Sequence, residues 1–275
     1  MSQILKEQIG NLEGAEYHFL CGPPCCGKGE MAYVIDKAFT PDTDDAGINA
    51  VLAGVGMCVL GTSALIKKHV DLGTHLAQEF KDAQQLQASG KNVSDAPITE
   101  ALALEIHEKY AQGYRTFVVD GYVRSEVQGK EVSALNHSYV FDVELDIRMC
   151  FQNLGRRLDS GIERVDNAKS LFPKRYKLYT DVWKKGPAAV RRRDPLRVKT
   201  LDGTCSVYSR VAQIIRWFGR LRPEYHEFIH NRLSDSSDPA GRRIAELAAK
   251  EALREPVIHV LPKRSERRFD VPVMA

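Results

Sequence analysis

The chain has 275 residues, of which 43% are hydrophobic and 27% charged, and its formal net charge is +3. This composition is typical of a globular protein with a substantial core, and so small a net charge does not predict nucleic acid or a membrane surface as a partner. The first residues lack the pattern of a signal peptide, and the longest apolar run, residues 50–60, is too short to cross a bilayer. We therefore expect a cytoplasmic protein with one domain, or with one domain and an appendage.

Short apolar segments that alternate with helical patterns predict the fold. The predicted strands are residues 17–21, 56–60, 116–120 and 140–143, with residues 196–199 as a candidate fifth. Helices are expected to begin near Lys28 and next to Thr62 or Ser63, either of which would serve as an N-cap. Strands that alternate with helices form a parallel sheet covered on both faces, so the predicted class is α/β. Ligands of such sheets bind at the carboxyl ends of the strands, where Gly22, Thr62 and Asp120 are expected to meet.

The segment between the first strand and the first of these helices has the residues of a polyphosphate-binding loop. It is Gly-Pro-Pro-Cys-Cys-Gly-Lys-Gly over residues 22–29, which matches the pattern G-x-x-x-x-G-K. Backbone N–H groups of such a loop surround phosphates, the helix N-terminus adds a positive dipole, and the Lys ammonium reaches the terminal phosphates. The alternative is a turn rich in glycine and proline with a solvated lysine. The predicted phosphate-binding residues are Gly22, Cys25, Cys26, Gly27, Lys28, Gly29 and Glu30.

The form Gly-Pro-Pro-x-x-Gly-Lys-Gly resembles the P-loop of adenylate kinases and other nucleoside monophosphate kinases. Further similar motifs follow in the same order: residues 61–67, residues 73–74 with 88–95, residues 120–128, residues 155–157, residues 164–167 with Arg175, and residues 202–203. The resemblance covers about residues 16–220. It implies a P-loop α/β domain over residues 1–220, with a helical acceptor-binding insertion at about 61–95 and a short lid at about 156–166.

This resemblance also implies an activity and a set of site residues. The activity is transfer of the γ-phosphoryl group of Mg-ATP to a nucleoside monophosphate, with AMP as the expected acceptor and ATP and AMP as the binding partners. The implied catalytic residues are Lys28, Asp120, Arg124, Arg156, Arg164 and Arg175. The implied acceptor-binding residues are Thr62, Lys67, Lys91, Val93, Gly121, Arg124 and Gln128, and Gln128 would bind the adenine edge. Asp120 would order water around Mg²⁺, with no direct protein ligand to the metal.

Among the residues that depart from the family pattern within the implied site, four leave a second function open. Glu30 stands where the family has Thr, Ala64 replaces Asp, Lys67 replaces Arg, and Gln152 stands near a usual lid Arg. A carboxylate about 4 Å from a phosphate charge costs up to about 4 kcal/mol at an effective dielectric constant near 20, unless Glu30 turns outward. The alternative is therefore a catalytically weak or inactive nucleotide-binding protein of the same fold, acting as a sensor or structural subunit.

Residues 221–275 lie beyond the family resemblance. Two amphipathic helical patterns are followed by a basic cluster at residues 263–268. We expect a helical extension that packs on the main domain of a monomer, with a partner-docking or oligomer-forming arm as the alternative.

Six scattered cysteines, without paired CxxC motifs, do not predict a zinc site and are expected to be reduced thiols. Cys25 and Cys26 lie at a predicted helix N-terminus beside Lys28, which raises a redox hypothesis for the loop. The alternative is that both are small residues that fill the loop.

Overall fold

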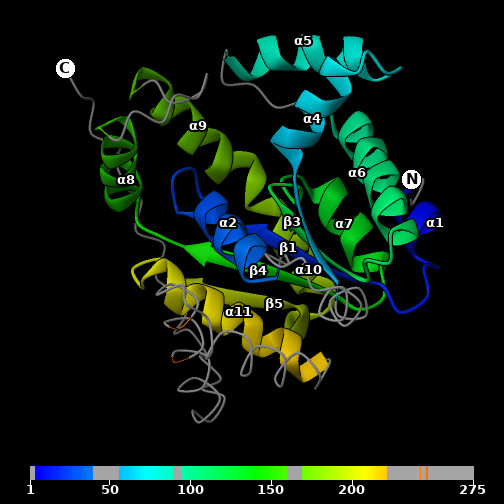
Figure 1. Ribbon diagram of the computed structural model, residues 1–275. Coiled ribbons are helices and arrows are strands. Elements are labelled where there is room, and N and C mark those ends of the chain that lie inside the picture. The colour runs from blue at the N-terminus through cyan, green and yellow to red at the C-terminus, as the bar shows by residue number, and fades with distance from the viewer. Residues whose placement is uncertain are drawn as a thin grey trace.

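The computed structural model describes residues 4–39, 56–88, 94–159 and 169–221, together with Arg242 and Glu246. Within these residues, five parallel strands form one sheet in the order β2-β3-β1-β4-β5 (Figure 1). The strands are β1 (Glu16–Cys21), β2 (Met57–Gly61), β3 (Thr116–Asp120), β4 (Ser138–Glu144) and β5 (Val198–Asp202). The predicted α/β class with a parallel sheet is thereby confirmed.

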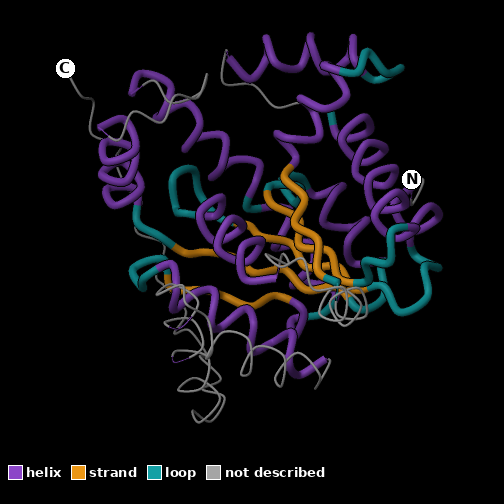
Figure 2. The backbone as a smooth tube through the Cα atoms, viewed as in Figure 1, coloured by secondary structure: helices purple, strands orange, loops and turns teal. Residues whose placement is uncertain are grey.

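Helices surround the sheet, whose strands run side by side through the middle of the molecule (Figure 2). The described α-helices are α1 (Ile4–Ile9), α2 (Lys28–Phe39), α4 (Thr62–Asp71), α5 (Ala77–Ala88), α6 (Asp95–Ala111), α7 (Glu126–Ala134), α8 (Ile147–Asp159), α9 (Phe172–Leu178), α10 (Lys185–Arg193) and α11 (Val207–Leu221). The structure also describes the 3-10 turns η1 (Lys169–Leu171) and η3 (Pro195–Arg197) and the π-helical segment η2 (Tyr179–Trp183).

Two hydrophobic clusters, one on each face of the sheet, form the core. Successive strand residues point to opposite faces, so Phe19 and Leu20 of β1 belong to different clusters, as do Phe117 and Val118 of β3. The Leu20 cluster includes apolar residues of α2 and α11, and the Phe19 cluster includes those of α1, α4, α6 and α7. Because both faces are covered, all six residues of β1 are buried, including the polar Glu16 and His18.

Several predicted boundaries differ from the structure by one or two residues, because β1 begins at Glu16, β2 spans Met57–Gly61 and β4 spans Ser138–Glu144. The fifth strand begins at Val198 rather than at residue 196, because Pro195 starts the 3-10 turn η3, whose N-cap Asp194 accepts a hydrogen bond from Leu196 N at 3.0 Å. Neither Thr62 nor Ser63 is the N-cap of α4; Gly61 takes that position without a side-chain cap.

Parts of the predicted domain plan lie outside the described residues. Of residues 222–275, only Arg242 and Glu246 are described, and both are helical. The segment 61–95 contains α4 and α5, whereas most of the predicted lid at 156–166 is not described. The domain boundaries therefore stay predictions. Within the described ranges, no helix is long and apolar enough to cross a membrane.

Candidate functional site

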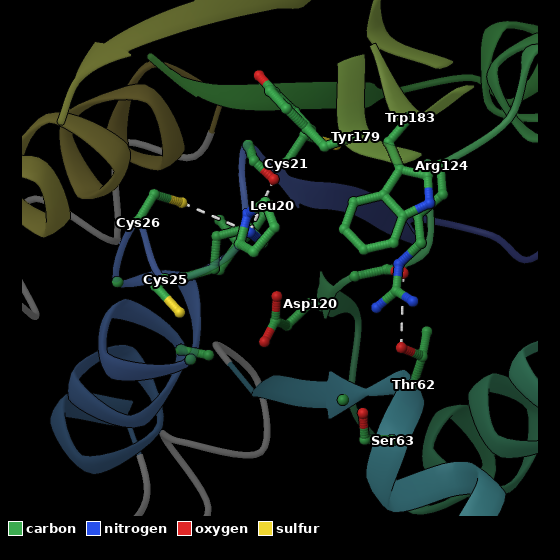
Figure 3. A pocket seen from close by; sticks show the side chains of 18 of the residues that line it. Leu20, Cys21, Cys25, Cys26, Thr62, Ser63, Asp120, Arg124, Tyr179 and Trp183 are labelled. Atoms are coloured by element: carbon green, nitrogen blue, oxygen red, sulfur yellow. Dashed lines mark hydrogen bonds between the residues drawn. The ribbon is translucent and has the colours of Figure 1, made fainter. Parts of the chain in front are cut away.

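A cavity of about 310 Å³ lies at the carboxyl ends of β1, β3 and β2, which are neighbours in the sheet (Figure 3). These strands are parallel, so the segments that follow them meet at one edge of the sheet, as the sequence predicted. The described residues that line the cavity are Leu20, Cys21, Gly22, Pro24, Cys25, Cys26, Gly27, Lys28, Gly29, Ala32, Gly61, Thr62, Ser63, Ala64, Asp120, Gly121, Val123, Arg124, Arg157, Arg175, Leu178, Tyr179, Trp183 and Pro187. The cavity thus brings together most of the predicted phosphate-binding residues.

The 22–27 loop, which joins β1 to α2, has a backbone that its glycines make possible. Gly22 has φ +137°, and a Cβ there would lie 2.8 Å from the Val143 carbonyl oxygen. Gly27 has φ +90°. Cys25 adopts φ 60° although it is not glycine, a conformation that costs roughly 1–2 kcal/mol for a residue with a side chain. The loop therefore holds a tight and partly strained shape at the start of α2.

Side chains outside the cavity bind two carbonyl groups of this loop. Asn153 Nδ2 on α8 donates to the Cys25 carbonyl oxygen at 3.0 Å, and Arg210 Nη1 on α11 donates to the Cys26 carbonyl oxygen at 2.6 Å. Neither Asn153 nor Arg210 lines the cavity. Because Asn153 and Arg210 bind these two carbonyl oxygens outside the cavity, the negative ends of the carbonyl dipoles are directed away from the space where a phosphate would lie.

Lys28, the first residue of α2, lies folded over the same loop. Its Nζ donates to the Gly22 carbonyl oxygen at 2.9 Å, to the Pro23 carbonyl oxygen at 2.8 Å and to Cys26 Sγ at 3.4 Å. An ammonium group has three hydrogen atoms to donate, so a phosphate that enters the cavity has to compete for some of these contacts.

Glu30 is exposed in the first turn of α2 and does not line the cavity. Of the two orientations that the sequence left open, the structure has the outward one. A carboxylate at that position favours the helix N-terminus by about 0.3–1 kcal/mol. In this conformation Glu30 therefore does not bring a negative charge to the cavity.

The opposite wall of the cavity contains Thr62, Asp120, Gly121 and Arg124. Asp120 ends β3, and Figure 3 shows its carboxylate between the 22–27 loop and Thr62. Thr62 is buried, and its Oγ1 donates to the Gly121 carbonyl oxygen at 3.5 Å. Gly121 has φ +85°, and a Cβ there would lie 2.6 Å from Arg124 Nη2. A carboxylate and a guanidinium thus face the loop across the cavity.

The remaining wall comes from α8, α9 and the π-helical segment. Arg157 and Arg175 line the cavity, whereas the predicted Arg156 is exposed and does not. Tyr179 and Trp183 also line it, and burial raises the pKa of the Tyr179 hydroxyl far above its usual range, so this hydroxyl stays neutral. Arg157, which follows the predicted Arg156, is therefore the arginine of α8 that can contact an anion in the cavity.

Gln128 and Lys67 occupy positions that differ from those expected of acceptor-binding residues. Gln128 is buried, and its Oε1 accepts from Arg124 N at 2.8 Å and from Ser125 N at 3.3 Å, as part of a capping box that begins α7. Both acceptor positions of the carboxamide oxygen are thus used, and this conformation leaves only the amide nitrogen for an adenine edge. Lys67 is exposed and pairs with Asp71 one turn later. Neither side chain lines the cavity.

Three predicted site residues, Lys91, Val93 and Arg164, lie outside the described residues. Cys25 lines the cavity and Cys26 is almost completely buried, and their redox sensitivity stays a hypothesis.

Asn153, Tyr179, Trp183 and Arg210 were not predicted from the sequence, and Arg157 was noted only as part of the 155–157 motif. Only Arg210 left a clear signal in the sequence. It stands at an apolar position of α11, on the same stripe as Val211, Ile214 and Phe218, where a charged residue needs a specific partner.

Comparison with known proteins adds no family to this description. No protein-family model matches the chain, and no curated protein matches it significantly. The chemistry of the site therefore rests on its own residues. Among the described residues, these are a glycine-bounded loop with a lysine at a helix N-terminus, three arginines and one carboxylate around the cavity. Such a set suits a ligand with several phosphate groups and an associated cation.

Proposed function

We propose that the protein is a phosphotransferase of the nucleoside monophosphate kinase type, which moves the γ-phosphoryl group of Mg-ATP to AMP. One observation carries this proposal: the 22–27 loop with Lys28 lies on one wall of the cavity, and Arg124 lies on another. A single phosphate ligand does not need two separate cationic walls, whereas a donor and an acceptor do. The ordered sequence motifs that resemble this family over residues 16–220 support the same proposal.

Phosphoryl transfer requires alignment and charge neutralisation more than covalent chemistry. The loop amides, the N-terminus of α2 and Lys28 would hold the donor phosphates. Arg124 would hold the acceptor phosphate, and Arg157 and Arg175 would neutralise charge on the group in transfer. All four cationic side chains line the cavity.

The site also suits the Mg²⁺ that accompanies ATP. Asp120 lines the cavity at the end of β3, and its carboxylate oxygens are the ligand type that Mg²⁺ and its bound waters prefer. Asp120 would hold the hydrated ion through water. The ion would supply further neutralisation of phosphate charge.

A nucleotide-binding protein with little or no catalysis is the second candidate. Ala64 lines the cavity where the family pattern has a carboxylate, and Lys67 and Gln128 have partners outside it. These features weaken the acceptor side. The outward position of Glu30 removes one argument for this candidate, because its carboxylate does not oppose a bound phosphate.

Product analysis by ³¹P NMR tests the proposal. Purified protein would be incubated with Mg-ATP and AMP, and compared with Lys28→Ala and with the matched control Lys37→Ala. Lys37 is an exposed lysine near the other end of α2. We expect ADP from the wild type and the control but not from Lys28→Ala, with AMP a better acceptor than UMP, CMP or GMP. Binding of ATP without transfer to any monophosphate would favour the second candidate.

A further inference from the structure

The guanidinium group of Arg124 is enclosed by two different surfaces. Its Cζ lies 4.9 Å from the centre of the Trp183 ring, which is a cation–π contact. The backbone of Gly121 approaches Nη2 so closely that a Cβ at Gly121 would lie 2.6 Å from it and 3.0 Å from Thr62 Oγ1. Figure 3 shows the indole beside the guanidinium, with Thr62 beyond it. Arg124 is therefore held in place within the cavity wall.

The contacts with Trp183 and with the Gly121 backbone restrict the rotation of the guanidinium. A guanidinium that is held in one orientation loses less conformational freedom when its N–H groups bind a phosphate. We propose that Trp183 is a positioning residue that orients Arg124 toward a phosphate monoester in the cavity, and so sets the affinity for the phosphoryl acceptor. This inference rests on the proposed function for the identity of the acceptor.

The backbone around Trp183 is built to keep the indole near Arg124. Gly186, three residues after Trp183, packs against Val123: a Cβ at Gly186 would lie 2.9 Å from the Val123 carbonyl oxygen. Gly129 of α7 approaches the same turn, since a Cβ there would lie 2.3 Å from the Gly186 carbonyl oxygen. The segment that carries Trp183 and the segment that carries Arg124 are thus joined by backbone contacts that allow no side chain between them.

Aromatic packing fixes the other end of the π-helical segment η2. The Tyr179 and Trp183 rings are 6.5 Å apart in an edge-to-face arrangement, and Tyr179 in turn lies 5.7 Å from Tyr176. Tyr176 lies 5.9 Å from Phe172. Short π-helical segments inside helices occur frequently at functional sites. Trp183 is only partly buried and lines the cavity, so its position is not explained by core packing alone.

Direct binding measurements with AMP and ATP test this role. The variants are Trp183→Leu, which removes the aromatic face, Trp183→Phe, which keeps one, and Arg124→Lys. We expect Trp183→Leu to raise the Kd of AMP about three- to tenfold and Trp183→Phe to change it less than about twofold. Arg124→Lys should weaken AMP binding at least as much as Trp183→Leu. The Kd of ATP should stay unchanged in both Trp183 variants, because Lys28 and the 22–27 loop are intact.

Fluorescence gives an independent measurement because the chain has two tryptophans, Trp183 and Trp217. Trp217 lies over Lys199, away from the cavity lining. In the Trp217→Phe protein, AMP should change the emission of the remaining Trp183; in Trp183→Phe, AMP should leave the Trp217 emission unchanged.

Two results would overturn the inference, and they are distinguishable. If Trp183→Leu binds AMP as tightly as the wild type while Arg124→Lys does not, the role of Trp183 is wrong and the acceptor site remains. If the wild type binds ATP but no AMP, the acceptor assignment itself fails, and the inference fails with it. Thermal unfolding of each variant checks the alternative that Trp183→Leu acts by unfolding the protein. In that case ATP binding would fall in parallel with AMP binding, which would also overturn the inference.

Discussion

Arg210 and Cys26, which are 184 positions apart in the chain, are joined by a hydrogen bond of 2.6 Å from Arg210 Nη1 to the Cys26 carbonyl oxygen. Arg210 is 6% exposed, and its Nε has no hydrogen-bond partner among the described residues. A Cβ at Gly27 would lie 3.0 Å from Arg210 Nη2, so the glycine also makes room for this side chain. The bond therefore couples α11 to the loop that is proposed to bind the donor phosphates.

Arg210→Met is expected to weaken ATP binding about tenfold with little change in stability. The substitution removes the donor that holds the Cys26 carbonyl, and a hydrogen bond from a charged group contributes about 1.5–3 kcal/mol. It also relieves the cost of burying a guanidinium with an unpartnered Nε, so the free energy of unfolding should change by less than about 1 kcal/mol. Calorimetric titration with ATP and denaturant unfolding measure the two quantities. Arg216→Met on the same helix is the control, and an equal loss of ATP affinity there would contradict the prediction.

Glu30→Thr is expected to leave turnover within about twofold of the wild type, because Glu30 is exposed and does not line the cavity. The loss of an acidic group from the first turn of α2 should lower the free energy of unfolding by about 0.3–1 kcal/mol. Initial rates of ADP formation and urea unfolding check both statements. A large rise in turnover would mean that the carboxylate turns toward the phosphates when ATP is bound.

Asp142→Asn is expected to stabilise the protein above pH 6. Burial on β4 raises the pKa of Asp142 from 3.8 to about 6, and the guanidinium of Arg191, 3.9 Å away, only partly opposes this. The unfolded state therefore loses this proton at lower pH than the folded state does, so stability falls as the pH rises from about 4 to 6. At 1.36 kcal/mol for each pKa unit, the loss is about 3 kcal/mol and is complete above pH 6.

Urea unfolding between pH 4 and 8 measures this effect. The wild type should lose stability over pH 4–6 relative to Asp142→Asn, and the two curves should run parallel above pH 6. Asp36→Asn replaces an exposed carboxylate on α2 and should follow the wild type. Curves for Asp142→Asn and the wild type that coincide at every pH would show that the Asp142 carboxyl titrates normally.

The sequence predicted the fold well where local pattern decides the structure. The first four strands are short segments in which apolar residues predominate, as expected of a parallel sheet that is covered on both faces. The cavity could be placed because the carboxyl ends of neighbouring parallel strands share an edge. The start of β5 could not be predicted. Residues 196–197 look extended in the sequence but belong to the 3-10 turn that the Asp194 side chain caps.

The details of the candidate site depend on contacts between distant segments, which no local pattern contains. Trp183 reaches Arg124 only because Gly186 and Gly129 allow α10 and α7 to approach closely. Gln128 has the right type for an adenine edge, but its carboxamide oxygen caps α7 in this structure. The sequence motifs therefore predicted which residue types lie at the cavity. The contacts that each side chain makes in the structure determine which of its atoms can bind a ligand.

Gly121→Ala and Gly113→Ala form a matched pair that separates backbone strain from the position of Arg124. Both glycines have positive φ, +85° and +98°, so an added Cβ should cost each variant a similar free energy of unfolding, roughly 1–2 kcal/mol. Only at Gly121 of this pair would the Cβ meet other side chains, Arg124 Nη2 at 2.6 Å and Thr62 Oγ1 at 3.0 Å, whereas nothing lies within 4 Å at Gly113. The Arg124 guanidinium must therefore move in Gly121→Ala, out of the space between Gly121 and Trp183.

We expect AMP binding to weaken about tenfold or more in Gly121→Ala and to stay unchanged in Gly113→Ala, measured at a temperature where both variants are folded. Equal AMP affinity in the two variants would mean that the position of the Arg124 guanidinium does not control acceptor binding.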